Sequence, residues 1–347
     1  MVVSNRIPAS WQRNVPLATY TTLQVGGPAE YFVVVKTSEE LVAATKQAQS
    51  LALPITVLGG GSNVLIADEG IPGLVIHMAL DKVRTEEKGT NIEVECGAGV
   101  NFDAMIAETV AAGWWGLENL SAIPGTVGAT PIQNVGAYGV EVADLIESIA
   151  VYDYYRGNEF KLTKKEFQFG YRHSIFKTEQ ARSWIITAVT FALSSVPRPQ
   201  LSYPDLAPLR KCVPDHPQPI REHVQIVRSE KFPDWRSVGT AGSFFKNPII
   251  DTATYQRLQQ EYPDLPGYPL TDSRIKVPLG WILDRVCGLR GYQDGPVGTY
   301  EGQALVLVQT GDATTSDIHR LATYIKETVK TATGISIDYE VTALPAE

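Results

Sequence analysis

The chain has 347 residues, of which 44% are hydrophobic and 20% charged, with a formal net charge of −8. This length predicts two or three domains, because single hydrophobic cores stop growing at about 250–300 residues. The acidic balance argues against nucleic acid as the main partner, since a phosphate backbone calls for a basic face. No apolar run approaches the ~20 residues of a membrane span, and the leader MVVSNRIPAS lacks the apolar core of a signal peptide. We therefore expect a globular cytoplasmic protein.

Apolar periodicity predicts a β-α-β unit near the start of the chain. Tyr31–Val35 is predicted as a strand, Thr37–Leu51 as a helix capped at its first or second residue, and Pro54–Leu58 as a second strand. This strand runs directly into Gly59-Gly60-Gly61-Ser62-Asn63, before a third apolar run at Val64–Ile66. A glycine turn after a β-α-β unit is a natural phosphate cradle. The spacing is not GxGxxG and no helix follows, which argues against a Rossmann domain.

Short strands and one helix are predicted over the next part of the chain. The helix is Phe102–Ala112, with Asn101 as its cap and Gly113 at its end. Strands are predicted at Leu74–His77, Ile92–Cys96, Leu145–Tyr154, Gly157–Leu162 and Trp184–Leu193, the last three antiparallel. The pattern indicates two small α+β units with the glycine loops at their boundary.

From Ser194 to Val227 prolines accumulate and apolar periodicity weakens, which predicts a domain connection. Beyond it, strands and helices alternate again. The predicted strands are Ser243–Phe245, Ala304–Gln309 and Ile335–Val341, and the predicted helices are Thr252–Glu261, Leu279–Val286 and Ser316–Thr331. In the last helix one apolar face, formed by Ile318, Leu321, Ile325 and Val329, is assigned to the core.

Cysteine and histidine usage indicates neither a disulfide framework nor a metal centre. The cysteines Cys96, Cys212 and Cys287 are too few and too scattered for either. The five histidines show no metal-ligand spacing. We therefore expect reduced, partly buried thiols and no bound metal.

The stretch from Asn119 to Gly139 is the most informative part of the sequence, because it holds four glycines and no charged side chain. A loop without side-chain bulk exposes backbone N–H groups, which bind an anionic diphosphate without Lys or Arg. Pro124 and Pro131 stiffen it, and Gln133 and Asn134 add polar side chains. The pattern favours a buried cofactor, with a glycine-rich surface loop as the alternative.

Two residues stand in settings that suit reaction chemistry. Arg172, among aromatic residues in the segment 169–177, is placed to hold a carboxylate or enolate by a two-point contact. A structural ion pair is the equally weighted alternative for Arg172. Ser243 follows a glycine and precedes two phenylalanines, but no GxSxG elbow supports a hydrolase. A serine donates a proton well only to a strongly basic acceptor, such as a carbanion or enolate.

Three other charged residues are less specific, Glu340 near the chain's end and Arg228 and Lys231 far upstream of it. Arg228 and Lys231 form a basic pair that suits a nucleotide diphosphate, although a solvated charge run is commoner. Glu340 stands near the end of the last predicted strand and indicates no chemistry by itself.

Six motifs follow one another from about Thr19 to Val341: TTLQVGGPA, LGGGSNVL, GLENLSAIPGTVGATPIQNVGAYGVE, FGYRHSIFK, AGSFFKNP and GQALVL. Together they resemble the UDP-N-acetylenolpyruvoylglucosamine reductases, the MurB family of peptidoglycan synthesis. The segment LSYPDL around Tyr203 resembles the substrate-covering tyrosine loop of the type I subgroup.

The resemblance implies an α+β fold, with a two-part FAD-binding domain of the vanillyl-alcohol-oxidase (PCMH) type at residues 1–72 and 73–215 and an α+β substrate-binding domain at 226–347. No histidine lies in either glycine segment, which favours non-covalent FAD. The implied FAD-binding residues are Leu58, Gly59, Gly60, Gly61, Ser62, Asn63, Val64, Ile123, Pro124, Gly125, Gly128, Ala129, Gln133, Asn134, Gly136, Ala137, Tyr138 and Gly139.

The resemblance also implies two hydride transfers. NADPH reduces FAD and leaves, and UDP-N-acetylglucosamine enolpyruvate then receives hydride at C3 from flavin N5, giving UDP-N-acetylmuramate. Arg172 and Glu340 match the residues that polarise the enolpyruvyl group, and Ser243 matches the proton donor to C2. The implied substrate-binding residues are Tyr203, Lys231, Asn247, Tyr268 and Gln303, with Lys231 and Tyr268 on the phosphates.

One departure and two alternatives accompany this reading. Tyr339 stands where the family commonly has proline, and the loss of a fixed φ is expected to loosen the approach to Glu340. One alternative is another flavoenzyme on the same scaffold, such as an oxidase of sugars or lactones. The other is a nucleotide-sugar-binding protein without turnover, which the presence of Arg172, Ser243 and Glu340 disfavours. A monomer is expected.

Overall fold

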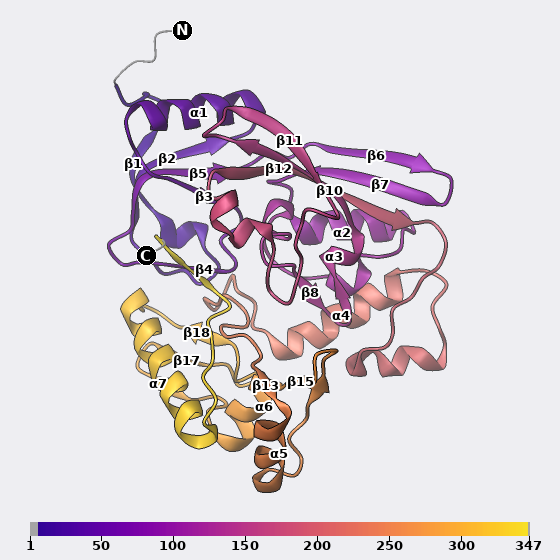
Figure 1. Cartoon of the computed structure of the whole chain (residues 1–347). Coiled ribbons are helices and arrows are strands. Elements are labelled where there is room, and N and C mark those ends of the chain that lie inside the picture. The colour runs from indigo at the N-terminus through magenta and orange to yellow at the C-terminus, as the bar shows by residue number, and fades with distance from the viewer. Residues whose placement is uncertain (1–5, 346–347) are drawn as a thin grey trace. The chain divides into compact units, whose positions relative to one another are not determined.

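The computed structural model describes residues 6–345, so that the first five residues of the predicted leader lie outside it. The chain divides into two compact units, and both are discontinuous in sequence (Figure 1). The first unit comprises Met1–Val15, Ala29–Gly60 and Pro72–Arg228, and the second comprises Pro16–Pro28, Gly61–Ile71 and Ser229–Glu347.

The first unit contains a four-stranded sheet that includes both strands of the predicted β-α-β unit, with a third strand between them. Helix α1 (Ser38–Ser50) connects two of its strands, and the Thr37 hydroxyl caps the helix by accepting the Glu40 N–H at 3.2 Å. Figure 1 shows α1 lying along these strands. The sheet order is β1 (Gln12–Pro16), β2 (Pro28–Val35), β5 (Ile71–Met78), β3 (Ile55–Leu58), with β3 and β5 parallel.

A second sheet of five antiparallel strands contributes many of the buried residues of this unit's core. Its order is β11 (Asn158–Thr163), β10 (Ile146–Asp153), β12 (Trp184–Ser194), β7 (Asn91–Gly97), β6 (Val83–Lys88). The predicted helix is α2 (Phe102–Ala111), capped by the Asn101 side chain. Strand β6 was not predicted, because every one of its side chains is exposed and it shows no apolar alternation.

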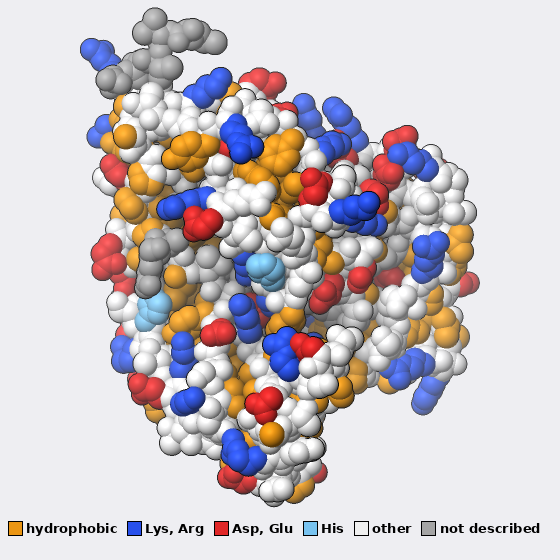
Figure 2. Space-filling model, viewed as in Figure 1, with side chains coloured by type: hydrophobic (Ala, Val, Ile, Leu, Met, Phe, Trp, Pro, Cys, Tyr) orange, Lys and Arg blue, Asp and Glu red, His pale blue; other side chains and the backbone are white. Residues whose placement is uncertain are grey.

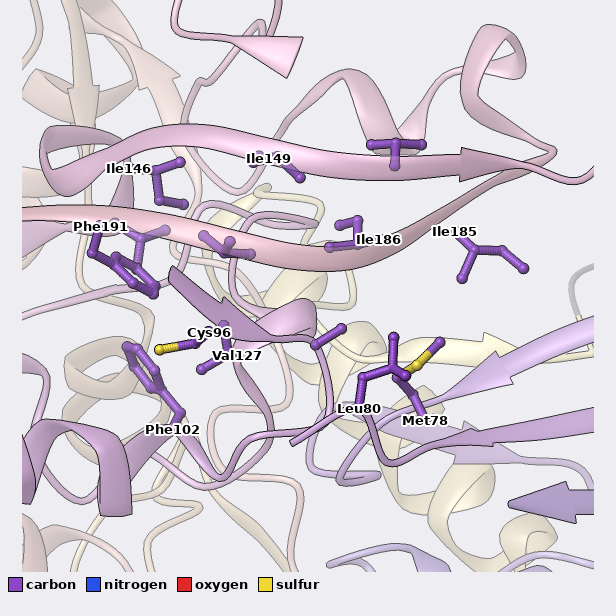
Figure 3. Packing of buried hydrophobic residues seen from close by; sticks show 14 of the residues in the cluster. Met78, Leu80, Cys96, Phe102, Val127, Ile146, Ile149, Ile185, Ile186 and Phe191 are labelled. Atoms are coloured by element: carbon purple, nitrogen blue, oxygen red, sulfur yellow. The ribbon is translucent and has the colours of Figure 1, made fainter. Parts of the chain in front are cut away.

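The core between α2 and this sheet includes part of the glycine-rich stretch (Figure 3). Cys96 points toward the rings of Phe102 and Phe191, whose centroids are 6.3 Å apart. Burial raises the pKa of the Cys96 thiol to about 12, so this cysteine serves packing rather than chemistry. Val127 is fully buried in the same cluster and anchors the glycine-rich stretch to the core.

The segment predicted as a domain connection, Ser194–Val227, is more ordered than expected. It contains a 3-10 helix at Pro204–Lys211 and most of helix α4 (Gln218–Lys231). Its prolines concealed α4, although Pro219 lies in the first turn, where a missing N–H costs nothing. Ile220 and Val224, one turn apart, are fully buried. Helix α4 was therefore not predicted from the sequence.

The second unit packs three helical segments with short strands. They are α5 (Thr252–Glu261), α6 (Leu279–Trp281) continued by a π-helical turn at Ile282–Val286, and α7 (Thr315–Thr333). The predicted apolar face of α7 is confirmed, because Ile318, Leu321, Ile325 and Val329 are completely buried. The first short sheet has the order β13 (Ile249–Asp251), β15 (Arg274–Lys276), β14 (Tyr268–Pro269), and the second has the order β16 (Gln293–Asp294), β17 (Val297–Thr299), β18 (Leu307–Gln309). In the third, β4 (Val64–Ile66) pairs with β19 (Thr342–Leu344).

Two predicted strands of this unit are wrong. Ser243–Phe245 is extended but pairs singly on each side, with Val306 and with Tyr339, so no ladder forms. The strand predicted at Ile335–Val341 instead begins at Thr342 and pairs in parallel with β4. The apolar alternation that suggested it, Ile335 and Ile337, reflects burial in the core and not strand pairing.

Over residues 6–345, no helix is both long and apolar enough to cross a membrane. On the face shown in Figure 2, basic and acidic side chains are interspersed and form no large basic patch.

Candidate active site

In the first unit the two glycine loops touch. A Cβ added to Gly60 would lie 2.8 Å from the Cα of Gly125, and one added to Gly59 would lie 2.5 Å from Oγ1 of Thr126. Real Cβ atoms do not come so close to other atoms, so larger residues at these positions would push the loops apart. The two loops therefore pack directly against each other through these residues.

The backbone around Thr126 leaves an N–H group facing this contact. Phe102 N donates to Gly125 O at 3.1 Å, and Val127 N donates to Val100 O at 2.9 Å. These two bonds flank the antiparallel pair of Thr126 and Asn101, which is therefore a non-hydrogen-bonded pair. In such a pair the residue's own N–H points away from the neighbouring strand. Thr126 N lies 3.5 Å from the Cβ position of Gly60, which places it on the side of the first loop.

The stretch ends in a tight hairpin. Strands β8 (Gly136–Ala137) and β9 (Val140–Glu141) are joined by Tyr138 and Gly139, whose φ angles are 49° and 85°. Two left-handed residues make the turn whose twist matches a hairpin. Tyr138 is buried, burial raises its pKa to about 12, and its ring meets Tyr203 edge-on at 5.3 Å. The predicted substrate-covering Tyr203 therefore lies beside the predicted cofactor loop.

Three charged residues hold the start of the stretch. The Asp103 carboxylate accepts the Ala122 N–H at 2.6 Å and an Arg221 N–H at 2.6 Å, while Arg228 Nε donates to Ala122 O at 3.2 Å. Ala122 has a φ of 60°, a left-handed conformation that these bonds stabilise. The sequence offered no motif for Asp103 or Arg221, and it suggested a diphosphate role for Arg228, whose guanidinium here supports the loop.

We predict that Asp103→Asn destabilises the first unit in a pH-dependent way. Burial raises the pKa of Asp103, but the Arg221 and Ala122 hydrogen bonds outweigh it, so the pKa lies below its ordinary value. The parent's extra stability, about 2 kcal/mol for a partly buried pair, is present above the unfolded pKa of about 3.9 and lost as pH falls through the folded pKa. Thermal unfolding should show a Tm gap at pH 7 that narrows below pH ~4. A gap of constant size down to pH 3 would contradict this source of stability.

Asn134 is engaged inside the protein. Its Nδ2 donates to Glu141 Oε2 at 2.7 Å and to Gly170 O at 3.2 Å, and its Oδ1 accepts the Ala143 N–H at 3.1 Å. The side chain is almost completely buried. The polar atoms that the sequence assigned to a cofactor thus connect the glycine-rich stretch to the segment that carries Arg172.

Arg172 lies at the tip of a tight turn. Gly170 and His173 exchange two backbone hydrogen bonds, at 3.1 and 3.2 Å, so Tyr171 and Arg172 occupy the two central positions. Arg172 has a φ of 53°, which is uncommon for a long side chain. Lys177 Nζ donates to the Arg172 carbonyl at 3.1 Å. A left-handed arginine held by surrounding bonds is typical of a functional position.

In the second unit the segments of Ser243 and Glu340 are hydrogen-bonded neighbours. Glu340 N donates to Phe244 O at 2.9 Å, and Phe245 pairs with Tyr339. On the other side of Glu340, Asn63 Nδ2 donates to its carbonyl at 3.1 Å. Asn63 O also accepts the Thr342 N–H at 3.0 Å. These contacts bring two of the predicted catalytic residues together with one predicted FAD residue.

The Tyr339 ring occupies a defined position beside Glu340. It stacks on Phe245 with centroids 5.4 Å apart, meets Phe244 edge-on at 5.7 Å, and lies 4.5 Å from Lys326 Nζ. The position that commonly carries proline in the family is therefore held here by aromatic packing.

Two predicted substrate residues meet at the start of α6. Asn247 Oδ1 accepts the Leu279 N–H at 2.9 Å. The Gln303 side chain packs against the next residue, Gly280, so closely that a Cβ added to Gly280 would lie 2.4 Å from Gln303 Oε1. Tyr268 is about half exposed on β14, and Lys231 is the last residue of α4.

The other predicted cofactor residues are distributed over both units. The first unit contains Leu58 at the end of β3, together with Ile123, Pro124, Gly128, Ala129 and Gln133. The second unit contains Gly61, Ser62 and Val64.

The first unit fits FAD. The diphosphate of the dinucleotide is an anion that backbone N–H groups bind, and the Thr126 N–H, which takes no part in the bridge to Asn101, lies where Gly60 packs against Gly125. Asn119 Oδ1, in the same stretch, is buried without a hydrogen-bond partner in the described part of the chain. A ligand N–H is the kind of group that satisfies such an acceptor.

Comparison with known proteins places the chain in a class. A family model described as an FAD binding domain matches residues 29–163. With an FAD-binding domain and a further α+β domain, the protein is an FAD-dependent oxidoreductase. The predicted fold class and cofactor are confirmed.

The second half of the chain identifies the family. The C-terminal domain model of UDP-N-acetylenolpyruvoylglucosamine reductase matches residues 234–344. Reductases of that name from Chromobacterium violaceum and Ralstonia nicotianae are 39% and 40% identical, over 95% and 94% of this chain and 98% and 96% of theirs. The crystal structure of the Thermus caldophilus reductase superposes with a TM-score of 0.69 at 28% identity, covering 96% of this chain and 98% of that one. The chain belongs to the UDP-N-acetylenolpyruvoylglucosamine reductase family, whose members use FAD and NADPH in peptidoglycan precursor synthesis.

Proposed function

We propose that Ser243, Glu340 and Arg172 are the catalytic residues with which this chain reduces UDP-N-acetylglucosamine enolpyruvate to UDP-N-acetylmuramate. The observation that carries the proposal is the hydrogen bond between Glu340 N and Phe244 O, which joins the segments of the proton donor and the acid. Bound FAD supplies the redox chemistry, taking reducing equivalents from NADPH and passing them to the enolpyruvyl double bond.

The protein's own side chains stabilise the negative charge that develops when hydride reaches the enolpyruvyl group, and then supply the proton that completes the reduction. As charge builds at C2 and on the carboxylate, the Arg172 guanidinium binds the carboxylate through two parallel N–H bonds. Glu340 polarises the same group. The Ser243 hydroxyl then gives its proton to C2, whose basicity compensates for the weak acidity of serine.

The proposal extends to binding. We assign Tyr203, Lys231, Asn247, Tyr268 and Gln303 to the nucleotide substrate. The glycine residues of both loops are assigned to non-covalent FAD. We also propose that the chain is divided into two FAD-binding subdomains, at residues 1–72 and 73–215, and a substrate-binding domain at 226–347. A monomeric state and a cytoplasmic location are proposed as well. Because the net charge is acidic, we propose no nucleic-acid partner.

The cofactor assignment predicts a yellow protein. Because no covalent link is expected, denaturation should release all of the flavin into the supernatant as FAD. Absorbance near 450 nm and chromatography of the released flavin measure this. A colourless protein that FAD does not reconstitute would contradict FAD binding. Flavin that stays with the denatured chain would contradict the non-covalent linkage.

The reaction itself is tested by anaerobic titration. NADPH should bleach the flavin absorbance, and UDP-N-acetylglucosamine enolpyruvate should restore it with one equivalent of UDP-N-acetylmuramate formed. Recovery with oxygen but not with the enolpyruvyl nucleotide would favour a sugar or lactone oxidase.

A further inference from the structure

Two asparagines of the cofactor loops reach the backbone of the segments that carry catalytic residues. Asn63 donates through Nδ2 to the carbonyl of Glu340 itself, at 3.1 Å. Asn134 donates through Nδ2 to the carbonyl of Gly170, at 3.2 Å, in the turn that carries Arg172. The first contact lies within the second unit and the second within the first unit.

The remaining bonds of both asparagines fix their side chains or backbones in place. Asn134 is almost completely buried, and Glu141 and Ala143 engage its other amide atoms. Asn63 O accepts the Thr342 N–H at 3.0 Å, beside the pair of Thr342 and Val64 with which the parallel β4–β19 ladder begins. The Asn134 amide is thus anchored independently of the carbonyl that it holds, whereas the Asn63 backbone is bound to the same segment that carries Glu340.

The segments they hold need such support. Arg172 sits at a φ of 53° in a two-residue turn, a conformation that its own steric preference opposes. Glu340 precedes the first residue of β19 by two positions, and its N–H is bound to Phe244 on the opposite side. A single added bond to a carbonyl removes the peptide's freedom to rotate, and small displacements of a catalytic group cost rate steeply.

We propose that Asn63 and Asn134 are positioning residues, which orient Glu340 and Arg172 and thereby connect the cofactor loops to the two catalytic segments. This inference rests on the proposed roles of Glu340 and Arg172. It gives both asparagines a function other than direct FAD binding.

The test is the isosteric pair of substitutions Asn63→Asp and Asn134→Asp, which keep an acceptor and remove the donor. Because Asn134 Nδ2 also donates to Glu141 Oε2 at 2.7 Å, Asn134→Asp is compared with Asn134→Ser, which places no second carboxylate beside Glu141. Expected results are an FAD dissociation constant and a rate of reduction by NADPH within about threefold of the parent, with reoxidation by the enolpyruvyl nucleotide slowed about 10- to 100-fold. Stopped-flow absorbance measures both half-reactions. Asn63→Ser and Asn134→Ser remove the amide without adding charge and serve where an Asp variant does not fold.

Gln49→Glu is the matched control. Gln49 Nε2 donates to the Tyr154 carbonyl at 2.9 Å, which is also an amide-to-backbone bond but an exposed one, at a residue with no proposed role. It should leave both half-reactions unchanged. Loss of FAD affinity in the Asn variants, with equal loss in both half-reactions, would overturn the proposal in favour of direct cofactor binding.

Double variants separate this inference from the proposed function. Asn63→Asp should add little in a Glu340→Gln background, and Asn134→Asp little in an Arg172→Lys background, because each pair acts as one unit. Full additivity would overturn the positioning role. If Glu340→Gln or Arg172→Lys alone leaves reoxidation unchanged, the proposed catalytic role of that residue fails instead.

Discussion

Replacing Ser243 with alanine should leave reduction of the bound flavin by NADPH almost unchanged and slow reoxidation by the enolpyruvyl nucleotide about 10²- to 10⁴-fold, the usual contribution of a general acid. The substitution removes one oxygen atom from a segment whose backbone bonds, Phe244 N to Leu305 O and Glu340 N to Phe244 O, do not involve that side chain. The loss should therefore come from proton transfer and not from displaced structure.

Anaerobic stopped-flow measurement of the two half-reactions provides the readout. Ser237→Ala is the control, because the Ser237 hydroxyl donates to the Asp234 carbonyl at 2.9 Å in the same unit and has no proposed role. It should leave both rates unchanged. Equal losses in both half-reactions of Ser243→Ala would contradict a proton donor and point to a general defect.

Elements with a clear apolar period were predictable from the sequence. The caps Thr37 and Asn101, the strand Val64–Ile66 and the buried face of α7 were all found, because each follows from local spacing or local hydrogen bonding. Helix α4 and strand β6 were missed for opposite reasons. Prolines hide the first, and the second is an exposed edge strand without apolar residues.

The candidate site shows the same division between local and long-range information. Composition alone indicated a neutral glycine cradle, since bulk and charge are properties of each residue. The close approach of Gly60 to Gly125 is tertiary, and no local pattern encodes it. Likewise, Asp103 lies in an ordinary helix turn, and only the fold brings Arg221 and Ala122 to its carboxylate.

The two asparagines show why polar residues in a motif are difficult to assign. An amide side chain binds a cofactor and a backbone carbonyl equally well. The sequence therefore predicted Asn134 as a cofactor residue, whereas the structure uses its three hydrogen bonds within the protein. A motif identifies which residues matter, and the hydrogen bonds indicate how they act.

Replacing Arg172 with glycine should move stability and activity in opposite directions. Arg172 has a φ of 53°, where a side chain is strained and glycine is not, so relief of this strain should stabilise the folded chain by up to about 1 kcal/mol, reduced by the loss of the guanidinium contact with the Tyr171 ring, 5.8 Å from its centroid. The reaction loses the guanidinium that binds the enolpyruvyl carboxylate. Reoxidation by the enolpyruvyl nucleotide should therefore slow about 10²- to 10³-fold, the usual effect of removing one group that stabilises developing charge.

Thermal unfolding and the same half-reaction kinetics test both parts. Arg172→Lys keeps the charge but not the two-point contact, so its reoxidation rate should fall between those of the parent and the glycine variant. Ala52→Gly is the conformational control, because exposed Ala52 also has a φ of 53° and lies just beyond α1. It should match the stability gain without loss of activity. A large fall in Tm for Arg172→Gly would mean that the guanidinium stabilises the turn. Arg172 would then be a structural residue, as in the alternative of a structural ion pair that the sequence left open.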